Sequence, residues 1–224
     1  MKVLIISGGS IDRDFCLSFI KEWRADYLIG VDKGLDFCKE EGIFPDYILG
    51  DFDSVKPDSL EFFKSQTIEV EIHPSKKDET DTQLAVEKAI RFLEENNDLK
   101  NGEICLLGAT GSRLDHVLGN IHLLAEPAKR GIHLEIVDKH NKIIMLSPGR
   151  YLFKKEKENG KYFSFFPFTD YVDGLTLDGF VYELKNYRME KETIKGYGVS
   201  NRLKKGEASL KFDSGLLLCM VSVD

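Results

Sequence analysis

Two aspartates that directly follow a short apolar run have the most readily interpreted chemistry in this sequence. They are Asp51 and Asp53, in the motif GDFDS at residues 50–54. The apolar residues 47–49 predict a buried strand, and in an extended segment residues two apart point to the same side. Two converging carboxylates suit a hard divalent cation such as Mg²⁺, which takes its other ligands from water and substrate phosphates. Aspartate and serine are also common turn residues, so this motif alone leaves an ordinary turn equally open.

Two further polar motifs strengthen the metal-site hypothesis. The first is KKDETD at residues 76–81, in which Asp81 opens a predicted helix. An acidic residue in the first helical turn also stabilises the helix dipole, so Asp81 by itself has a structural explanation as well. The second is GATGSRLDH at residues 108–116, where Arg113 follows two glycines at the start of another predicted helix. An arginine in that place can bind a phosphate with two parallel hydrogen bonds.

The composition is that of an ordinary globular protein and argues against several classes of function. The chain has 224 residues, a formal net charge of −7 and a pI near 5.4, so we expect no nucleic-acid partner. No apolar run approaches the roughly 20 residues of a membrane span, and the apolar N-terminal run is too short for a signal peptide. The four cysteines form no C-x-x-C pair, which predicts neither a zinc site nor disulfides and favours a cytoplasmic location.

The first part of the chain alternates between predicted strands and helices. Apolar runs predict strands at residues 3–7, 27–31, 47–49, 68–72, 104–107 and 134–137. Ser10 could cap the first predicted helix, and the second ends at Gly42. Further helices are predicted to begin near Pro57, at Thr80 in the form of a capping box, and near Arg113. In the last helix we expect an apolar stripe to pack into the core; it consists of Leu114, Val117, Leu118 and Ile121.

After about residue 140 the pattern changes to short β-like runs. They lie at residues 142–146, 151–153, 162–166, 175–177, 181–187, 208–212 and 216–223, and no convincing helical period accompanies them. The sequence therefore predicts an α/β fold: an N-terminal Rossmann-like parallel sheet flanked by helices, plus a C-terminal all-β sandwich. The expected domains are residues 1–140 and 141–224.

Ligands of open α/β sheets bind beyond the carboxyl ends of the strands. That rule gathers residues 7–9, 32–34, 51–54, 76–81 and 108–113 at one edge of the predicted sheet. Ser7 and Gly8 could present backbone N–H groups to a phosphate, or could form a plain tight turn. Asp32 could bind a ribose hydroxyl or a metal-bound water, or could cap the next helix. Such a collection of Asp, Gly, Lys and Arg is typical of a site for a metal–nucleotide complex.

On the helix near residue 113, a second stripe is polar. It carries Arg113, His116 and Asn120, which are spaced to share one face. Ser112, Asp115 and His116 superficially suggest a hydrolase triad, but they lie too close together along one helix and no G-x-S-x-G motif is present. His116 is more simply interpreted as a hydrogen-bonded structural histidine.

Together, the motifs at residues 50–54, 76–81 and 108–116 resemble those of the thiamine pyrophosphokinase family. A fourth segment, GVSN at residues 198–201, resembles the G-x-S-N thiamine-binding segment of that family. The resemblance runs in order through nearly the whole chain. It implies transfer of a pyrophosphoryl group from Mg·ATP to the hydroxyl of thiamine, giving thiamine diphosphate and AMP.

The resemblance also implies roles for individual residues. Asp51, Asp53 and Asp81 would hold Mg²⁺ against the ATP phosphates, and Arg113 would neutralise charge on the transferred group. Asp78, Thr80 and Asp115 would support Arg113; Ser7 and Gly8 would bind the nucleotide, and Asp32 would lie near the nucleotide or the metal. Ser200 and Asn201 would contact thiamine, and the site would lie between the subunits of a homodimer.

The resemblance leaves one residue to be assigned. Family members often have a tryptophan in the β domain that stacks on thiamine, whereas the only tryptophan here is Trp23. Tyr187 or Tyr197 could supply an aromatic face instead.

Two other functions use the same sheet edge. A nucleotide-sensing module would need no chemistry, although a sensor has no need of three aspartates around a metal. An NAD-dependent oxidoreductase would fit the spacing of Gly8 and Asp32, although the G-x-G-x-x-G fingerprint is missing.

Overall fold

The computed structural model describes residues 1–74, 76–154, 160–193, 198–204 and 206–224. The chain divides into two compact units, Met1–Lys139 and His140–Asp224, and each is described by itself. No helix among the described residues is long and apolar enough to cross a membrane.

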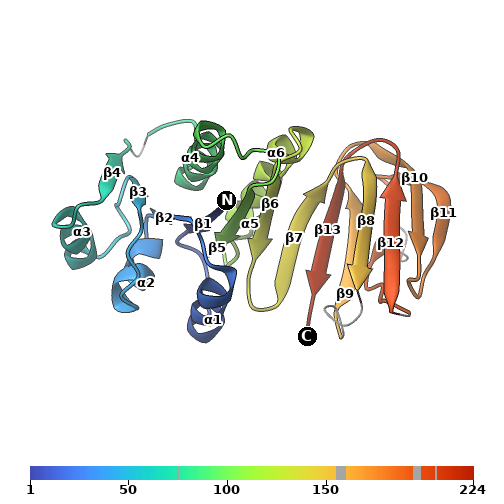
Figure 1. Cartoon of the computed structure of the whole chain (residues 1–224), viewed down its shortest axis with the longest axis horizontal. Helices are drawn as coiled ribbons and strands as arrows, with labels where there is room; N and C mark the ends of the chain where they lie inside the picture. The colour runs from blue at the N-terminus through green and yellow to red at the C-terminus, as the bar shows by residue number, and fades with distance from the viewer. Residues whose placement is uncertain (75, 155–159, 194–197, 205) are drawn as a thin grey trace. The chain divides into compact units, whose positions relative to one another are not determined.

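The first unit is built on a parallel sheet. Its strands are β1 (Lys2–Ile6), β2 (Tyr27–Val31), β3 (Tyr47–Gly50), β4 (Glu69–Ile72), β5 (Glu103–Leu107) and β6 (His133–Val137). They lie side by side in the order β4-β3-β2-β1-β5-β6, and every neighbouring pair is parallel. This confirms the predicted α/β fold class (Figure 1).

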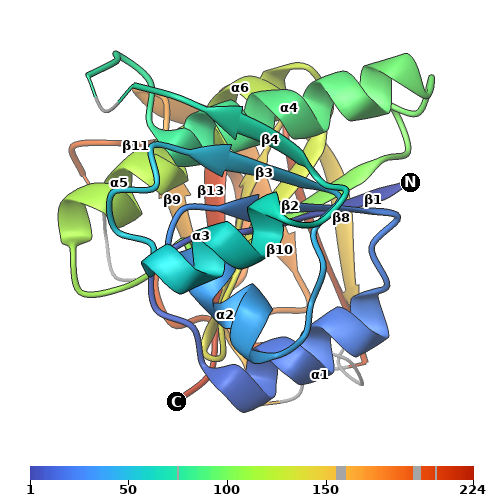
Figure 2. The ribbon, with the colours of Figure 1, turned by 90° about the vertical axis from the view of Figure 1, so that its left-hand side faces the viewer.

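Helices connect these strands and cover both faces of the sheet. They are α1 (Arg13–Trp23), α2 (Gly34–Glu40), α3 (Pro57–Lys64), α4 (Asp81–Glu95), α5 (Leu114–Leu123) and α6 (Ala125–Lys129). Figure 2 shows α1, α2 and α3 on one side of the sheet and α4 and α6 on the other. On the first side, a core cluster joins Leu4 and Ile48 of the sheet to Cys16 of α1, Leu35 of α2 and Phe63 of α3.

The strand order reverses once, and this reversal locates the site. From β1 the chain builds outward through β2, β3 and β4, and then returns by way of α4 to place β5 on the other side of β1. In open α/β sheets, ligands bind at the carboxyl ends of the strands where such a reversal occurs. Here that point lies between the exits of β1 and β5.

Two local expectations in this unit were wrong. Helix α1 is capped by Asp12, whose side chain accepts the Phe15 amide, rather than by Ser10. The apolar stripe of α5 is only partly buried: Ile121 is 9% exposed, whereas Leu114 and Leu118 are 77% and 58% exposed. Periodicity identified the stripe correctly but could not show that half of it faces outward.

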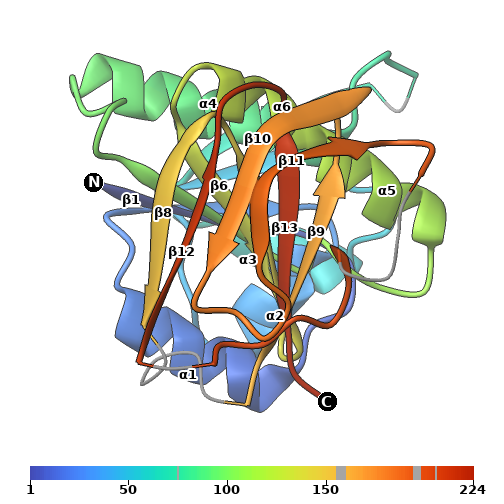
Figure 3. The ribbon, with the colours of Figure 1, turned by 90° about the vertical axis from the view of Figure 1, so that its right-hand side faces the viewer.

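The second unit contains two antiparallel layers and no described helix. The first is formed by β7 (Asn141–Leu146), β13 (Leu217–Ser222) and β9 (Tyr162–Pro167), in that order. The second has the order β11-β10-β12-β8, with bounds Leu184–Glu190, Tyr171–Asp178, Glu207–Phe212 and Gly149–Lys154. Figure 3 shows the second layer in front of β13 and β9.

Alternate side chains of both layers meet in one apolar core. Phe163 and Phe165 of β9 belong to the same buried cluster as Leu175 of β10 and Leu210 of β12. Antiparallel strands with one buried face produce this alternation, and two such layers over one core make a β-sandwich. The predicted C-terminal β domain is therefore confirmed.

Candidate active site

A cavity of about 690 Å³ opens at the carboxyl edge of the parallel sheet. Residues 7–10, 32–33, 54, 77–82 and 108–113 line it, together with His116, Val117 and Asn120 of α5. The segments that follow successive strands thus meet at one place, as the sequence predicted. The polar stripe of Arg113, His116 and Asn120 also faces this cavity.

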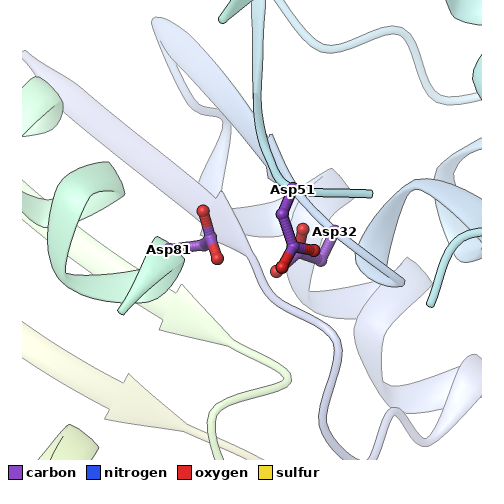
Figure 4. Close-up of side chains that lie close together, drawn as sticks. All are labelled: Asp32, Asp51 and Asp81. Carbon is purple, nitrogen blue, oxygen red and sulfur yellow. The ribbon is translucent and has the colours of Figure 1, made fainter. Parts of the chain in front are cut away.

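Three carboxylates converge beside the cavity. Asp32 follows β2, Asp51 follows β3, and Asp81 is the first residue of α4; each offers an oxygen within 4.8 Å of the others (Figure 4). All three are half-buried. Carboxylate oxygens are the ligands that Mg²⁺ takes from proteins, so this donor set fits a hard divalent cation.

The backbone around this cluster is unusual, and a glycine makes it possible. Asp32 has a φ of 44° and Phe52 a φ of 57°, both in the left-handed region. A Cβ atom at Gly50 would lie only 1.9 Å from Oδ1 of Asp32, so no larger residue fits there without moving the carboxylate. Strained conformations of this kind persist where the surroundings enforce them, and they concentrate at functional sites.

Crowding changes the acidity of the cluster. Burial raises the pKa of the Asp32 carboxyl to about 7, and the charges of Asp81 and Asp51 add to the increase, while Lys77 acts in the opposite direction. The Phe52 amide, 3.4 Å from Oδ1 of Asp32, favours the ionised form. Without a cation, the site therefore resists holding all three negative charges.

Asp53 lies beside this cluster rather than within the group of three. Its amide donates to Oδ1 of Asp51 at 3.1 Å, forming a tight Asx turn, and the Asp51 charge raises the pKa of the exposed Asp53 carboxyl. The premise that residues 51–53 are extended was wrong, because β3 ends at Gly50 and Phe52 is left-handed. Asp32, which the resemblance placed near the nucleotide or the metal, lies within the group of three.

Lys77 forms an ion pair with one member of this acidic group. Its Nζ lies 2.5 Å from Oδ1 of Asp81, and the two side chains are only 12% and 15% exposed. Lysines in a charged loop are ordinarily solvated surface, and the neighbouring Lys76 is exposed in this way, whereas Lys77 is not.

The loops after β1 and β5 pack against each other through their backbones. The Gly9 amide donates to the Gly108 carbonyl at 2.7 Å and the Ser10 amide to the Thr110 carbonyl at 2.6 Å. A Cβ atom at Gly9 would lie 2.4 Å from both carbonyl oxygens, so this approach requires glycine. Loops built this way can present N–H groups to an anion.

The start of α4 is held against the first of these loops. Oγ of Ser7 lies 2.9 Å from Oγ1 of Thr82, and Thr80 caps the helix by accepting the Gln83 amide at 3.1 Å. The second half of the predicted capping box is absent, because the Gln83 side chain donates to Glu87 instead. Asp78 and Thr80 both line the cavity.

Arg113 lies at the rim of the cavity and is paired with Asp115. Its Nη2 is 2.6 Å from Oδ2 of Asp115, and the side chains are 69% and 65% exposed. This contact lowers the pKa of the Asp115 carboxyl. On the same helix, Nδ2 of Asn120 donates to the Ala109 carbonyl at 2.8 Å and so fixes the loop after β5.

In the second unit, the neighbours Ser200 and Asn201 differ in environment. Asn201 is completely buried: its Oδ1 accepts the Tyr182 and Arg202 amides at 3.0 and 2.9 Å, and its Nδ2 donates to the Tyr182 carbonyl at 2.8 Å. Ser200 is exposed, has a φ of 55°, and its amide donates to Oγ of Ser164. The Asn201 side chain thus shapes the segment that displays Ser200.

Of the aromatic candidates, Tyr197 lies outside the described residues, and Tyr187 packs partly buried against the β core. Sequence reasoning missed Tyr182, which is 54% exposed and held by Asn201. It placed Lys33 and Lys77 at the sheet edge without giving them a role, and it missed Thr82; all three line the cavity. The signal for these three was available, since each directly adjoins a strand-exit motif.

An open parallel sheet with glycine-rich loops and clustered carboxylates at its strand reversal is typical of a protein that binds a metal–nucleotide complex. Comparison with known families gives the particular one. Residues 20–136 match the model of the thiamin pyrophosphokinase catalytic domain, and residues 150–217 match that of the thiamin pyrophosphokinase vitamin B1 binding domain. The chain belongs to the thiamine pyrophosphokinase family, and the predicted family and transferase activity are confirmed.

Individual relatives agree in sequence and in fold. The chain is 36% identical over 196 residues to the thiamine pyrophosphokinase of Bacillus subtilis, covering 88% of this chain and 87% of that protein. The crystal structure of the B. subtilis thiamine pyrophosphokinase superposes with a TM-score of 0.84 at 32% identity, covering both chains completely. The thiamin pyrophosphokinase of Candida albicans has a TM-score of 0.80 over 100% of this chain and 89% of its own, but at 20% identity it supports the fold alone.

Proposed function

We propose that this chain transfers the pyrophosphoryl group of ATP to the hydroxyl of thiamine, with the acidic cluster as the metal site of the reaction. The observation that carries this proposal is the convergence of Asp32, Asp51 and Asp81 within 4.8 Å beside a cavity of about 690 Å³. A cavity of that size lies within the range of small-molecule sites.

The metal-site residues in this proposal are the three converging aspartates, with Asp53 completing the acidic set next to Asp51. Mg²⁺ bound there would offset negative charge on the ATP phosphates. The protein's own contribution is to hold three carboxylates close together, which the Gly50 contact and the left-handed Asp32 backbone achieve.

The polyphosphate would lie along the loops after β1 and β5. Backbone N–H groups of Gly8 and the Gly108–Gly111 loop, with the N-terminal end of α4, would supply donors for phosphate oxygens. The expected Ser7 amide is not among these donors, because it donates to the Leu107 carbonyl at 2.9 Å; Ser7 lines the cavity with its hydroxyl beside Thr82. Thr80 and Asp78 shape this end of the cavity. Arg113, held at the rim by Asp115, would contact the transferred group as its charge redistributes.

The chemical step is an in-line displacement. The thiamine hydroxyl oxygen attacks the β-phosphorus, the bond from that phosphorus to the oxygen bridging to the α-phosphate breaks, AMP leaves, and the hydroxyl proton is released. No covalent enzyme intermediate is needed, because positioning and charge stabilisation carry this type of reaction. Ser200 would contact thiamine, while Asn201 would act by shaping the Ser200 segment.

A homodimer is the second part of the proposal. Leu114 and Leu118 lie one turn apart on α5 and are largely exposed, on the helix whose Arg113, His116 and Val117 line the cavity. Adjacent exposed leucines are typical of a surface that another protein covers. A second copy of the chain would cover them next to the active site.

A cytoplasmic location is also part of the proposal. All four cysteines are buried, and none of them forms a disulfide in the described structure. Cysteines kept as thiols are typical of proteins in a reducing compartment.

Product analysis tests the activity. Purified protein would be incubated with Mg·ATP and thiamine, with Asp51→Asn run alongside, because asparagine keeps the shape and removes the charge. We expect AMP and thiamine diphosphate in equal amounts from the native protein, and a loss of at least about 100-fold in the variant, the scale at which removing one electrostatic contact acts. ADP with thiamine monophosphate would show a different reaction, and no thiamine-dependent product would refute the substrate. Mg²⁺-dependent AMP release also separates an enzyme from a nucleotide sensor.

A further inference from the structure

Unlike most surface lysines, Lys77 is largely buried and lies in the proposed active site. Its ammonium contacts Asp81 at 2.5 Å, its side chain is 12% exposed, and it lines the same cavity as the loops that would bind phosphate. Its neighbour Lys76 is exposed to solvent.

An ordinary helix-surface ion pair does not explain this contact. Residues 77 and 81 are four apart, but α4 begins only at Asp81, so Lys77 lies before the helix and gains no helical spacing. Exposed ion pairs contribute little because water screens them. Here both partners are largely withdrawn from water, and an unpaired ammonium so placed would be costly.

The Asp81 carboxylate that contacts Lys77 is also a candidate metal ligand. Asp81 is one of the three aspartates that fit a divalent cation, and a cation there would repel an ammonium at ion-pair distance. The lysine side chain is a mobile point charge on a flexible four-carbon stem.

We propose that Lys77 is an exchangeable counter-ion: it neutralises Asp81 in the metal-free protein, and moves to the polyphosphate when the metal and nucleotide bind. This inference rests on the proposed metal site and assigns a substrate-binding role to Lys77. The binding of metal and the binding of polyphosphate are then coupled through one side chain. The metal frees the Lys77 ammonium for the polyphosphate, and the polyphosphate draws the ammonium away from the Asp81 carboxylate that the metal needs.

Lys77→Met tests the exchange, because methionine keeps length and flexibility and removes the charge; Lys76→Met is the matched control. The first measurement is calorimetric titration with Mg²⁺ in the absence of nucleotide. Removing a competing cation should tighten Mg²⁺ binding by about 10-fold. The second is titration with pyrophosphate at saturating Mg²⁺. Losing a charged hydrogen bond should weaken that binding by about 10- to 100-fold. Lys76→Met should leave both affinities unchanged.

Opposite changes in the two affinities are the signature of the exchange. If Lys77 only supports the loop, both affinities fall together, or neither changes, and the inference is overturned. Thermal melting in EDTA identifies a variant that is merely misfolded, and Lys77→Arg, which keeps the charge, should then retain pyrophosphate binding if the exchange is correct. A native protein that binds no Mg²⁺ would refute the metal site itself. Equal Mg²⁺ affinity in the native protein and in Lys77→Met would leave the metal site standing and refute only the exchange.

Discussion

Asp32 shows how a single residue can serve a site and destabilise the fold that carries it. Its left-handed backbone and its two carboxylate neighbours are both unfavourable in isolation. Its pKa of about 7, against an ordinary value of 3.8, expresses the cost of the charge. A metal ion at the site would reverse that cost by compensating the charge.

The raised pKa of Asp32 predicts how the stability of the metal-free protein depends on pH. The folded protein holds a proton on Asp32 more tightly than the unfolded chain does, so the contribution of Asp32 to stability is fully present below about pH 4 and is lost as the pH rises through 7. In EDTA, the melting temperature of the native protein should therefore fall between pH 5 and 8. Asp32→Asn removes the titrating group, and asparagine also tolerates the left-handed conformation.

Melting curves in EDTA at several pH values would check this. At pH 8 we expect Asp32→Asn to melt at least about 2 °C above the native protein, which corresponds to ~1 kcal/mol in a chain of this size. The slope with pH should become shallower without vanishing, because the pKa of Asp53 is also raised. Equal slopes in both proteins would show that Asp32 does not carry this titration.

At the residue scale, the sequence predicted the acidic site but not its membership. Asp51 and Asp81 were identifiable because each follows an apolar run or opens a helix. Asp53 lies beside the group of three rather than within it, because one left-handed residue, Phe52, turns the chain where the sequence suggested an extended segment. Nothing in the residue type of phenylalanine predicts a positive φ, since bulky residues rarely adopt it.

At the scale of elements, the agreement is much closer. Strand β2 has the predicted bounds, and the glycine-rich and acidic segments follow their strands as expected. Hydrophobic periodicity identifies such elements because it records which face is buried. It fails for Leu114 and Leu118, where an apolar face is exposed in the chain taken alone. It also displaced β11, expected at residues 181–187 and found at Leu184–Glu190.

The segment at residues 200–203 gives the prediction that belongs to this scale. Asn201 connects it to Tyr182 and supports the bridges Phe163–Asn201 and Phe180–Leu203. Asn201→Ala would leave two amides and a carbonyl without this partner in a buried place, at a cost of about 2–4 kcal/mol. Ser200→Ala at the exposed neighbouring position should change stability by less than about 0.5 kcal/mol and should instead raise the KM for thiamine.

Urea unfolding and steady-state kinetics of the two variants would separate these roles. The expected pattern is a loss of stability in one variant and a loss of substrate affinity in the other. A Ser200→Ala protein with unchanged KM would remove Ser200 from the thiamine site. An Asn201→Ala protein of native stability would contradict the role assigned to its buried amide.

At the scale of the whole molecule, the chain forms two compact units. The first is a parallel sheet covered by helices, and the second is a β-sandwich. The change from strand–helix alternation to short β runs predicts a boundary after residue 140, because the two architectures bury their residues with different periods. Assembly leaves no comparable trace in a single sequence. An exposed leucine pair becomes visible only when the surface of the folded chain is known.

The last prediction concerns that pair. Replacing Leu114 and Leu118 together by glutamate places two charges on the face of α5 that a second copy would cover, and buried unpaired charges strongly disfavour association. Sedimentation at about micromolar concentration should show a dimer for the native protein and a monomer for the double variant. Leu152→Glu is the matched control, since Leu152 is 65% exposed on β8 and the proposal gives it no role.

Activity measurements distinguish a dimer in which the partner contributes to the active site from a dimer in which each chain carries a whole site. If the partner completes the thiamine site, the monomeric variant should lose thiamine turnover while it still binds Mg²⁺, because Asp32, Asp51 and Asp81 all belong to one unit of one chain. Full turnover by the monomer would mean that each chain carries a whole site. A double variant that remains dimeric would place the interface elsewhere, and the exposed leucines of α5 would then need another explanation.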